Sequence, residues 1–356
     1  MAEEVFKSVS ECPSVKGYRR SIIYDLYRKT YDYIPNSLHY LLESCQGKSL
    51  TSIKKEFDDP GMIDEYLVFL LEKEYIFMTE REDLASFPGL DRTWEYPALV
   101  SNAVISLNAK SEIDFPALII QLEELGCRHL CIISENPRGV EYYITLLKQL
   151  SGSNSLSVEI IAPFEDGFDI QTMKVIISTF ARLRFFILIS APEEGEFHMG
   201  DPLFGAFVKI KGSPHLNDDC RNNFRKYFNV NINLFSEAQA HNPFFNRKVF
   251  IDAQGYICNN SLPGNRFGHL DETPIKEIIE KPGFKRIWNI SKDSIEVCRD
   301  CEYRYMCLDN RIPDELPEKE WRHRTECHYN PYIGLWKGEQ DYLSVKDWER
   351  NELLKQ

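Results

Sequence analysis

The N-terminal part of the chain first alternates apolar and polar positions and then changes to helical spacing. Residues 18–34 predict a β-hairpin, whose first arm has apolar side chains at every second position, namely Ile22, Tyr24 and Leu26. Asn36 is expected to cap the next helix. The apolar face of that helix is Leu38, Leu41, Leu42 and Cys45. Two more helices, at 49–57 and 62–74, and a strand at 75–79 complete a winged-helix-like module of about 80 residues.

From residue 99 onward, continuous apolar strands alternate with amphipathic helices. Asp114 is expected to begin the first of these helices, and Gly126 is expected to end it. Apolar strands joined by such helices are typical of a parallel sheet covered by helices. The middle of the chain therefore predicts an α/β fold, closed as a partial (β/α) barrel. The expected strands are 99–107, 129–134, 157–162, 184–190, 205–210 and 229–235.

The loop after the first of these strands, residues 108–114, lies where a (β/α) barrel ordinarily carries its chemistry. It contains no cysteine, no histidine and no glycine-rich segment. Cys127 and Cys131 have the spacing that opens a CxxxCxxC cluster motif, but Ser134 occupies the third position. Because this pair spans a helix end and the following strand, Cys131 is expected to be an ordinary buried thiol.

Composition narrows the class of protein. The chain has 356 residues, of which 43% are hydrophobic, which is typical of a folded protein with two or three domains. Its net charge of -13 argues against non-specific binding to nucleic acid or to anionic membranes. The N-terminal sequence has no apolar signal segment, and no apolar run approaches about 20 residues. We therefore expect a cytoplasmic protein, in which clustered cysteines stay reduced and can bind metal.

The segment VCRDCEYRYMC concentrates three cysteines in one short stretch. Cys298, Cys301 and Cys307 follow a C-x2-C-x5-C pattern, and Cys327 follows later in the chain. Two cysteines separated by two residues can face one ion, because the chain turns between them. Four thiolates suit either tetrahedral zinc or a 4Fe–4S cluster. The sequence therefore predicts a metal site with these four ligands and leaves the metal open.

The region from Asn242 onward resembles the SPASM domain, the C-terminal cluster-binding domain of radical SAM peptide-modifying enzymes. The resemblance rests on KVFIDAQGYICNN, which matches that domain's opening hairpin with Gly255 at its turn. It also rests on TPIKEIIEKPGFKRIW and on the cysteine pattern. It implies one auxiliary 4Fe–4S cluster, with zinc as the alternative, bound by Cys298, Cys301, Cys307 and Cys327.

The chain departs from that family in two places. Asn260 and Arg311 stand where the family has ligands of another auxiliary cluster, so Cys258 and Cys220 are expected to be ordinary thiols. The CxxxCxxC motif, which holds the cluster that binds S-adenosylmethionine, is absent from the whole sequence. The resemblance therefore implies no S-adenosylmethionine cluster, and no radical chemistry is expected from this chain alone.

The N-terminal module resembles the peptide-recognition elements of enzymes that mature ribosomally made peptides. Such elements add a leader peptide as a strand at the exposed edge of a hairpin, beside the third helix. The alternatives are a structural cap and a DNA-binding winged helix, for which the hairpin is locally basic. The peptide-binding residues that the resemblance implies are Ile22, Tyr24, Leu26, Tyr66 and Leu70.

Over nearly its full length the chain resembles the SPASM-domain peptide maturases of grasp-with-spasm systems. The resemblance implies a leader-recognition domain at 1–92, a partial barrel at 93–238 and a SPASM domain with tail at 239–356. It implies two partners, a precursor peptide and an ATP-grasp ligase, and the sequence is compatible with a homo-oligomer. The alternatives are an active radical SAM-like peptide-modifying enzyme and a zinc-stapled interaction protein. No residue stands out as catalytic, including His198, His215 and His241.

Overall fold

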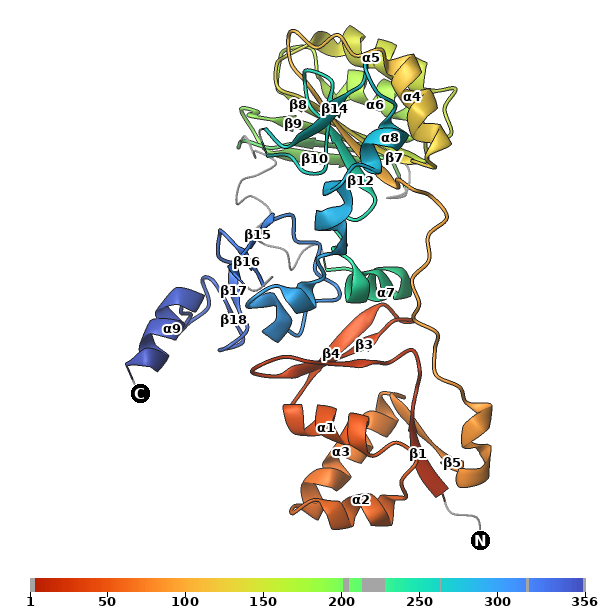
Figure 1. Cartoon of the computed structure of the whole chain (residues 1–356), viewed down its shortest axis with the longest axis vertical. Helices are drawn as coiled ribbons and strands as arrows, with labels where there is room; N and C mark the ends of the chain where they lie inside the picture. The colour runs from red at the N-terminus through yellow and green to blue at the C-terminus, as the bar shows by residue number, and fades with distance from the viewer. Residues whose placement is uncertain (1–3, 201–204, 213–227, 263, 318–319, 355–356) are drawn as a thin grey trace. The chain divides into compact units, whose positions relative to one another are not determined.

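The structure, a computed structural model, describes residues 4–200, 205–212, 228–262, 264–317 and 320–354. The chain divides into two compact units. The first unit comprises residues 1–94, 222–243 and 290–356, and the second comprises residues 95–221 and 244–289. Figure 1 shows by colour that the first unit combines the two ends of the chain, drawn in red and in blue.

The N-terminal module of the first unit is a three-stranded antiparallel sheet followed by three helices. The sheet runs in the order β2 (Ser14–Lys16), β3 (Ser21–Asp25) and β4 (Thr30–Ile34). The helices are α1 (Asn36–Ser44), α2 (Leu50–Glu56) and α3 (Pro60–Glu72). A separate pair joins β1 (Glu4–Ser8) to β5 (Ile76–Glu80), and the 3-10 helix η1 (Arg81–Ser86) follows. The predicted hairpin, helices and closing strand are present, whereas β1 and β2 are elements that the sequence pattern did not reveal.

The start of α1 differs from the prediction. Pro35 occupies the N-cap position, and Asn36 is the first residue of the helix. The side chain of Asn36 instead accepts a 2.6 Å hydrogen bond from Ser21 and donates one to the carbonyl oxygen of Tyr18. Asn36 therefore fixes the segment that leads into β3 rather than capping the helix. Short-range sequence rules do not predict this role, because its partners lie at least 15 positions away.

Strand β3 is buried on both faces. Ile23 packs into a core with the helices, together with Leu41, Ile63 and Leu70. Ile22 and Tyr24, on the opposite face, pack with Tyr303, Met306 and Tyr329 from the cysteine-bearing segment. An apolar residue on each face is the pattern of a strand covered on both sides. The sheet is therefore the layer that joins the N-terminal helices to the C-terminal segment within the first unit.

The remaining part of the first unit has little regular structure. Its elements are α7 (Ile232–Ala240), η5 (Lys292–Ser294), η6 (Cys298–Asp300), β15 (Pro313–Glu315), β16 (Trp321–His323), β17 (Tyr329–Asn330), β18 (Leu335–Trp336) and α9 (Val345–Leu353). The strand predicted at 229–235 is wrong, because α7 begins there. The side chain of Asn231 accepts a 2.9 Å hydrogen bond from the N–H of Leu234, which caps that helix.

The second unit is built on one nine-stranded, mostly parallel sheet. Its order is β10-β11-β9-β8-β7-β6-β12-β13-β14. The strands in parallel pairs are β6 (Asn102–Leu107), β7 (His129–Ser134), β8 (Ser157–Pro163), β9 (Leu183–Ile189), β11 (Ala206–Lys209) and β12 (Lys248–Ile251). The antiparallel additions are β10 (Gly195–His198), β13 (Tyr256–Cys258) and β14 (Arg266–His269). The sheet is open, with β10 and β14 at its edges.

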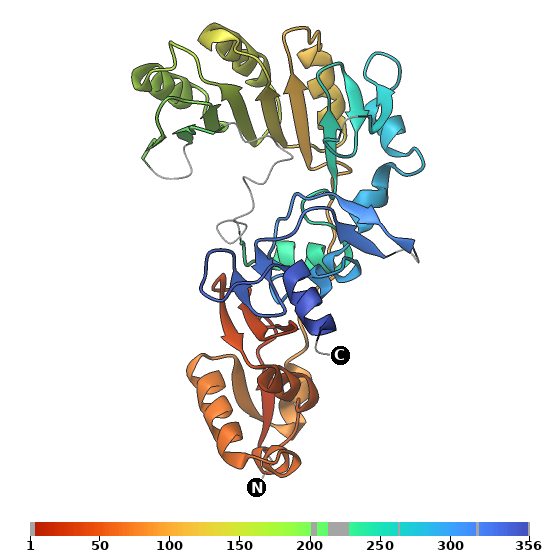
Figure 2. The same cartoon turned by 90° about the vertical axis from the view of Figure 1, so that its left-hand side faces the viewer.

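Three helices cover one face of this sheet, as Figures 1 and 2 show: α4 (Phe115–Glu124), α5 (Gly139–Leu150) and α6 (Ile170–Thr179). Two short helices, α8 (Ile275–Ile279) and η4 (Phe284–Asn289), follow β14. Side chains along β7 and β8 alternate between buried and half-buried. This period of two indicates that the face under the helices is the better covered one.

Both ends of α4 agree with the prediction. The side chain of Asp114 accepts a hydrogen bond from the N–H of Ala117 and caps the helix start. Gly126 follows the helix end with a φ of +80°, and the N–H of Cys127 donates to the carbonyl oxygen of Leu122. This bond pattern is a Schellman motif, which requires a left-handed residue and so favours glycine.

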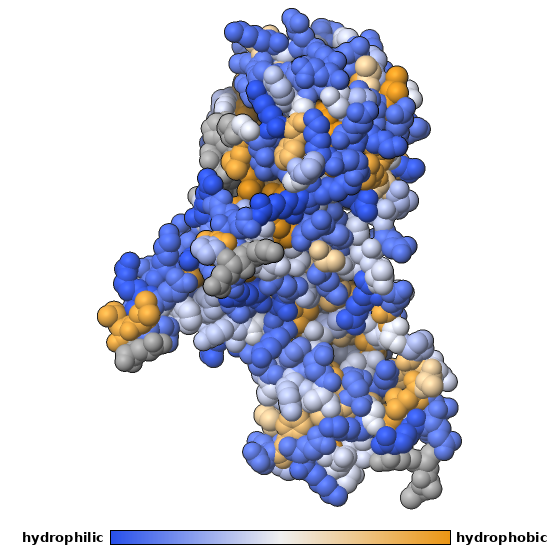
Figure 3. Space-filling model, viewed as in Figure 1, coloured by the Kyte–Doolittle hydropathy of each residue, from blue (hydrophilic) through white to orange (hydrophobic). Residues whose placement is uncertain are grey.

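The hairpin matched to the SPASM opening is present as β12 and β13, with Gly255 at its turn (φ +88°). It was expected within residues 239–356, but β12 pairs in parallel with β6, so the hairpin extends the central sheet of the second unit. No helix in the described part of the chain has the length and apolar character needed to cross a membrane. Figure 3 shows a mainly hydrophilic face, with apolar side chains gathered in small patches such as the one over β5 and η1.

Candidate metal centre

The cysteine-bearing segment of the first unit begins with a tight turn. Val297, with a φ of +67°, precedes the single 3-10 turn of η6. The N–H of Cys301 then donates a 3.0 Å hydrogen bond to the carbonyl oxygen of Cys298. This bond closes the turn and brings the ends of the C-x2-C pair together, as the sequence pattern predicted. Val297 is β-branched, so its left-handed conformation is strained and must be held by the surrounding packing.

The four predicted ligands share one electrostatic neighbourhood. Burial, the largest cause, raises the pKa of the Cys298 thiol to about 11 and that of Cys307 to about 12; the charge of Lys292 acts against these shifts, and a charge on Cys327 contributes to them. Burial likewise raises the pKa of Cys301 well above its usual range, and charges on Cys298 and Cys307 add to the shift. The nine cysteines in the described residues are all free thiols. The donor set fits a metal that replaces four thiol protons, so binding would release protons.

A group of charged side chains lies buried beside these thiols. Asp309 is 1% exposed and accepts hydrogen bonds from Arg311, the shortest from Nη2 at 2.6 Å. Lys292 Nζ lies 3.7 Å from Asp309 Oδ2, and His323 Nε2 lies 3.3 Å from the same oxygen. Burial tends to raise the pKa of Asp309, but the charges of Arg311 and Lys292 outweigh it and hold this carboxyl ionised.

His323 adds a nitrogen donor to this group. Ligand atoms of Cys298, Asp309 and His323 all lie within 4.8 Å of one another. Burial lowers the pKa of His323 to about 3, so its imidazole is neutral at pH 7, which is the form that binds metals. Its two ring nitrogens make no hydrogen bond among the described residues. Sequence reasoning missed His323 and Asp309, although both lie within four residues of a predicted cysteine ligand.

The residues present therefore fit either metal. Cys298, Cys301, Cys307 and Cys327 would hold a 4Fe–4S cluster, whose chemistry is the transfer of single electrons. A zinc ion could take thiolates together with the neutral imidazole of His323. Arg311, which stands where the family has a ligand of another cluster, forms an ion pair with Asp309.

The predicted peptide-binding side chains lie mainly in the core. Ile22 and Tyr24 are fully buried, and Leu26 and Leu70 are at most 5% exposed. Tyr66 is half-buried, and its hydroxyl lies 2.7 Å from that of Ser37. The four buried side chains already contribute to the two cores of the first unit, so they are not free to contact a peptide. The hairpin residues alternate as expected, but the face that the prediction chose packs against the cysteine-bearing segment.

The remaining cysteines and histidines form no second centre among the described residues. Cys127 and Cys258 are buried, and burial raises the pKa of Cys127 to about 12 and that of Cys258 to about 11. Cys131 was expected to be buried but is half-buried. Exposed His198 pairs with Glu196, and His241 stacks edge-on against Trp94. Cys220 and His215 lie outside the described residues.

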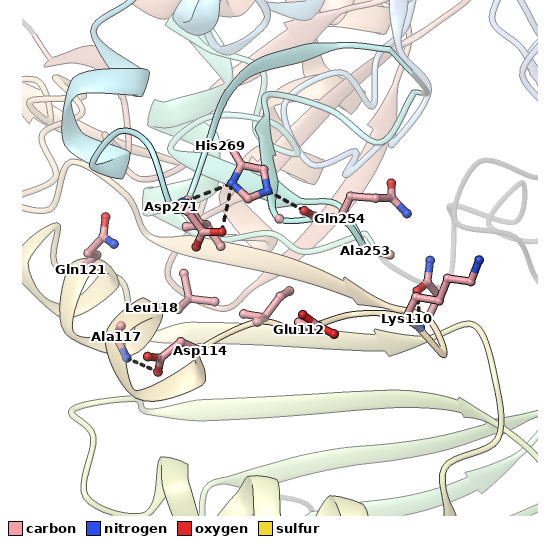
Figure 4. Close-up of a pocket in the computed structure, with 14 residues that line it drawn as sticks. Lys110, Glu112, Asp114, Ala117, Leu118, Gln121, Ala253, Gln254, His269 and Asp271 are labelled. Atoms are coloured by element: carbon pink, nitrogen blue, oxygen red, sulfur yellow. Dashed lines mark hydrogen bonds and ion pairs between the residues drawn. The ribbon is translucent and has the colours of Figure 1, made fainter.

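A cavity of about 400 Å³ lies at the carboxyl ends of β6 and β12 in the second unit (Figure 4). The chain runs from β6 to β7, β8 and β9 on one side, whereas β12 lies on the other, so the strand order reverses at this point. Loops that leave in opposite directions open a crevice at such a switch point. The cavity is lined by polar side chains, among them Lys110, Glu112, Gln254, His269 and Asp271.

Several polar groups around this cavity are already engaged. One ring nitrogen of His269 lies 2.7 Å from the carbonyl oxygen of Gln254, and the other accepts from the N–H of Asp271 (Figure 4). Ser111 donates to the carbonyl oxygen of Ala253 and so ties the loop after β6 to the hairpin. The lining contains no cysteine. The cavity can take a small polar molecule, but its described lining has no thiolate for a cluster.

Comparison with known proteins finds little. No family model matches the chain, and no curated protein matches its sequence. A crystal structure of SuiB from Streptococcus suis bound to S-adenosylmethionine is similar with a TM-score of 0.37 and 9% identity, covering 85% of this chain and 95% of that one. A second SuiB structure from the same organism is similar with a TM-score of 0.28 and 10% identity, covering 85% of this chain and 94% of that one. Scores this low support no conclusion about the fold or activity of this chain.

Proposed function

We propose that the chain is a maturation partner for a ribosomally synthesised peptide. Its N-terminal module binds the leader of the precursor, one auxiliary 4Fe–4S cluster sits among the four cysteines, and an ATP-grasp ligase forms the bonds. The observation that carries the proposal is the core shared by the sheet of the N-terminal module and the cysteine-bearing segment. A peptide bound to the module would be presented by the same compact unit that carries the predicted cluster.

Strand β4 supports the proposed peptide site. It pairs with β3 alone among the described strands, so its outer edge offers unpaired backbone groups for an added strand. Asp32 of β4 forms an ion pair with Lys73, and its carboxylate accepts a hydrogen bond from the hydroxyl of Tyr75. Because Lys73 directly follows α3, the end of this helix lies beside β4. One flank of α3 carries half-buried apolar side chains at helical spacing: Met62, Tyr66 and Phe69. Of the predicted residues, Tyr66 is thus the one suited to touch a peptide.

Radical chemistry is no part of the proposal. The loop after β6 has no cysteine, and its backbone is held by neighbouring side chains: the N–H of Ala109 donates to Asn136, and Arg138 donates to the carbonyl oxygen of Asn108. A loop without thiolates cannot bind the cluster that S-adenosylmethionine requires. The cross-linking step is therefore assigned to the ligase.

The test is a binding titration with the leader half of a candidate precursor peptide, labelled with fluorescein. We expect micromolar or tighter binding by fluorescence anisotropy. Tyr66→Ser is expected to weaken it at least tenfold, whereas Val68→Ser, an exposed residue elsewhere on α3, leaves it unchanged. Absence of binding to the wild-type chain, or equal loss in both variants, contradicts the peptide site. Co-purification with a candidate ATP-grasp ligase tests the second partner.

A zinc-stapled interaction protein is the second candidate. It is favoured by one observation, the neutral imidazole of His323 within 4.8 Å of the Cys298 sulfur and Asp309. Zinc accepts such mixed donors, whereas the cubane cluster takes four thiolates. Metal analysis of chain purified without oxygen separates the two, because the zinc form is colourless and contains no sulfide.

A further inference from the structure

Lys292 is a buried ammonium group with unusual surroundings. Its residue is 1% exposed, and lysine is almost never buried to this degree unless a partner compensates its charge. Among the described residues, the carboxylate that pairs with it is Asp309, at 3.7 Å, which is beyond hydrogen-bond range. Nζ makes no hydrogen bond among the described residues. The ammonium group therefore has three donors in a dry environment and none of them is used.

Asp309 does not balance this charge. Its carboxylate already receives three hydrogen bonds from the side chain of Arg311: Nε donates to each oxygen at 3.0 Å, and Nη2 donates to Oδ2 at 2.6 Å. One carboxylate thus faces two cations, and His323 contributes none because burial keeps it neutral through a lowered pKa. Lys292 therefore shares Asp309 with Arg311, which holds the shorter contacts, and the Lys292 ammonium group stays 3.7 Å away.

The Lys292 ammonium group also lies close to the predicted cysteine ligands. The oxygen of Asp309 lies within 4.8 Å of Cys298 Sγ, so Lys292 and this sulfur flank the same carboxylate. Burial tends to lower the pKa of Lys292, but the thiolate of Cys307, followed by Asp309 and Cys298, raises it overall. Thiolates bound to a metal would therefore place negative charge close to the Lys292 ammonium group.

We infer that Lys292 is a charge-compensating residue for the metal centre, which raises the reduction potential of its cluster. A 4Fe–4S cluster with four thiolates has an overall charge of about -2, and it reaches about -3 when a reductant supplies one electron. A fixed cation in a low-dielectric site stabilises the more negative form more strongly. The inference rests on the cluster in the proposed function but not on peptide binding.

The test compares reconstituted full-length chains under anaerobic conditions. Iron and sulfide are measured first, and the cluster is then titrated with dithionite and mediators and followed by electron paramagnetic resonance. Lys292→Met removes the charge, Lys292→Arg keeps it, and Lys337→Met is the matched control at an exposed lysine of the same unit. We expect Lys292→Met to lower the reduced-to-oxidised ratio at a fixed potential at least tenfold, a shift of about 59 mV for a one-electron couple.

The outcomes separate the claims. If the wild-type chain binds no iron, the cluster fails as part of the proposed function. If it binds iron, and Lys292→Met has the wild-type potential, the inference about Lys292 is overturned and the cluster remains. If Lys292→Met retains no iron, Lys292→Gln is titrated as well. If both variants lose iron and their metal-free chains unfold at the same temperature as the wild-type chain, charge compensation is supported. If the metal-free chains of both variants no longer fold, Lys292 has a purely structural role and the inference is overturned.

Discussion

Arg20 Nε donates a 2.7 Å hydrogen bond to Oε1 of Glu302, across a sequence separation of 282 residues. Glu302 is 0% exposed, and the hydroxyl of Tyr329 donates to the same oxygen at 2.5 Å. The hydroxyl of Tyr24 donates to the backbone carbonyl of Glu302 at 2.8 Å. These bonds connect the N-terminal sheet to the residue that follows Cys301, so they fix the position of the N-terminal module relative to the cysteine-bearing segment.

Removal of the Arg20 side chain is expected to weaken this connection. Arg20→Ala leaves the buried carboxylate of Glu302 without its cation, and we expect it to reduce the free energy of unfolding by about 3 kcal/mol. The measurement is urea unfolding of the metal-free chain. Arg19→Ala is the control, because Arg19 is exposed, and its effect should stay within about 0.5 kcal/mol. Equal effects of the two substitutions would show that the pair is not structural.

The four cysteine ligands are expected to act together in metal binding. Cys298→Ala or Cys327→Ala should reduce iron from about four atoms per chain to less than one, because a cubane needs every corner held. Cys127→Ala and Cys258→Ala serve as controls, since both thiols lie in the second unit. The measurement is iron and sulfide analysis of chain purified without oxygen. Full iron content in Cys298→Ala would refute the ligand set.

Gly126 is expected to tolerate no side chain. A Cβ atom there would lie 2.5 Å from the Cβ of Ala98, and the residue has a φ of +80°. Gly126→Ala should lower the free energy of unfolding by about 2 kcal/mol, because strain and overlap act together. Gly152→Ala is the matched control, because its added Cβ meets nothing within 4 Å. Thermal unfolding of both variants is the measurement, and a neutral Gly126→Ala would contradict the helix end described above.

The stability of the second unit is expected to depend on pH through His129. Burial lowers the pKa of His129, and the charge of Arg128 lowers it further. The folded state therefore disfavours the protonated ring. The stability that neutral His129 supplies is complete above the usual pKa of about 6.5, and it is lost as the pH falls through the lowered pKa of the folded state. Between about pH 6.5 and pH 5, the wild-type Tm should fall more steeply than that of His129→Gln. Parallel Tm profiles would disprove the contribution of His129.

The helices and most strands were predictable because they depend on neighbours along the chain. Asp114 and Gly126 bound α4 as expected, since a side-chain cap and a left-handed residue act within a few positions. The same local rules failed at residues 229–235, where apolar alternation indicated a strand. There the cap at Asn231 begins α7, and the alternating pattern is too short to distinguish the two structures.

The candidate cysteine ligands were likewise predicted from their spacing, because a turn of fixed length brings the C-x2-C pair together. The charged group beside them could not. Lys292, His323 and the Asp309–Arg311 pair come from three segments, and none is unusual in its own sequence context. They become significant because burial removes water from all four at once, and then each charge depends on the others.

The amino-acid order alone thus predicts the local helices and strands and the candidate cysteine ligands, because periodicity and spacing act over a few positions. It also shows that β3 has three consecutive apolar residues, Ile22, Ile23 and Tyr24. What covers each face of β3 cannot be read from that pattern, because both faces are apolar and one of them packs against a segment that is distant along the chain. Tertiary packing buries Ile22 and Tyr24 against the cysteine-bearing segment. The outer edge of β4 is then the surface proposed for an added peptide strand.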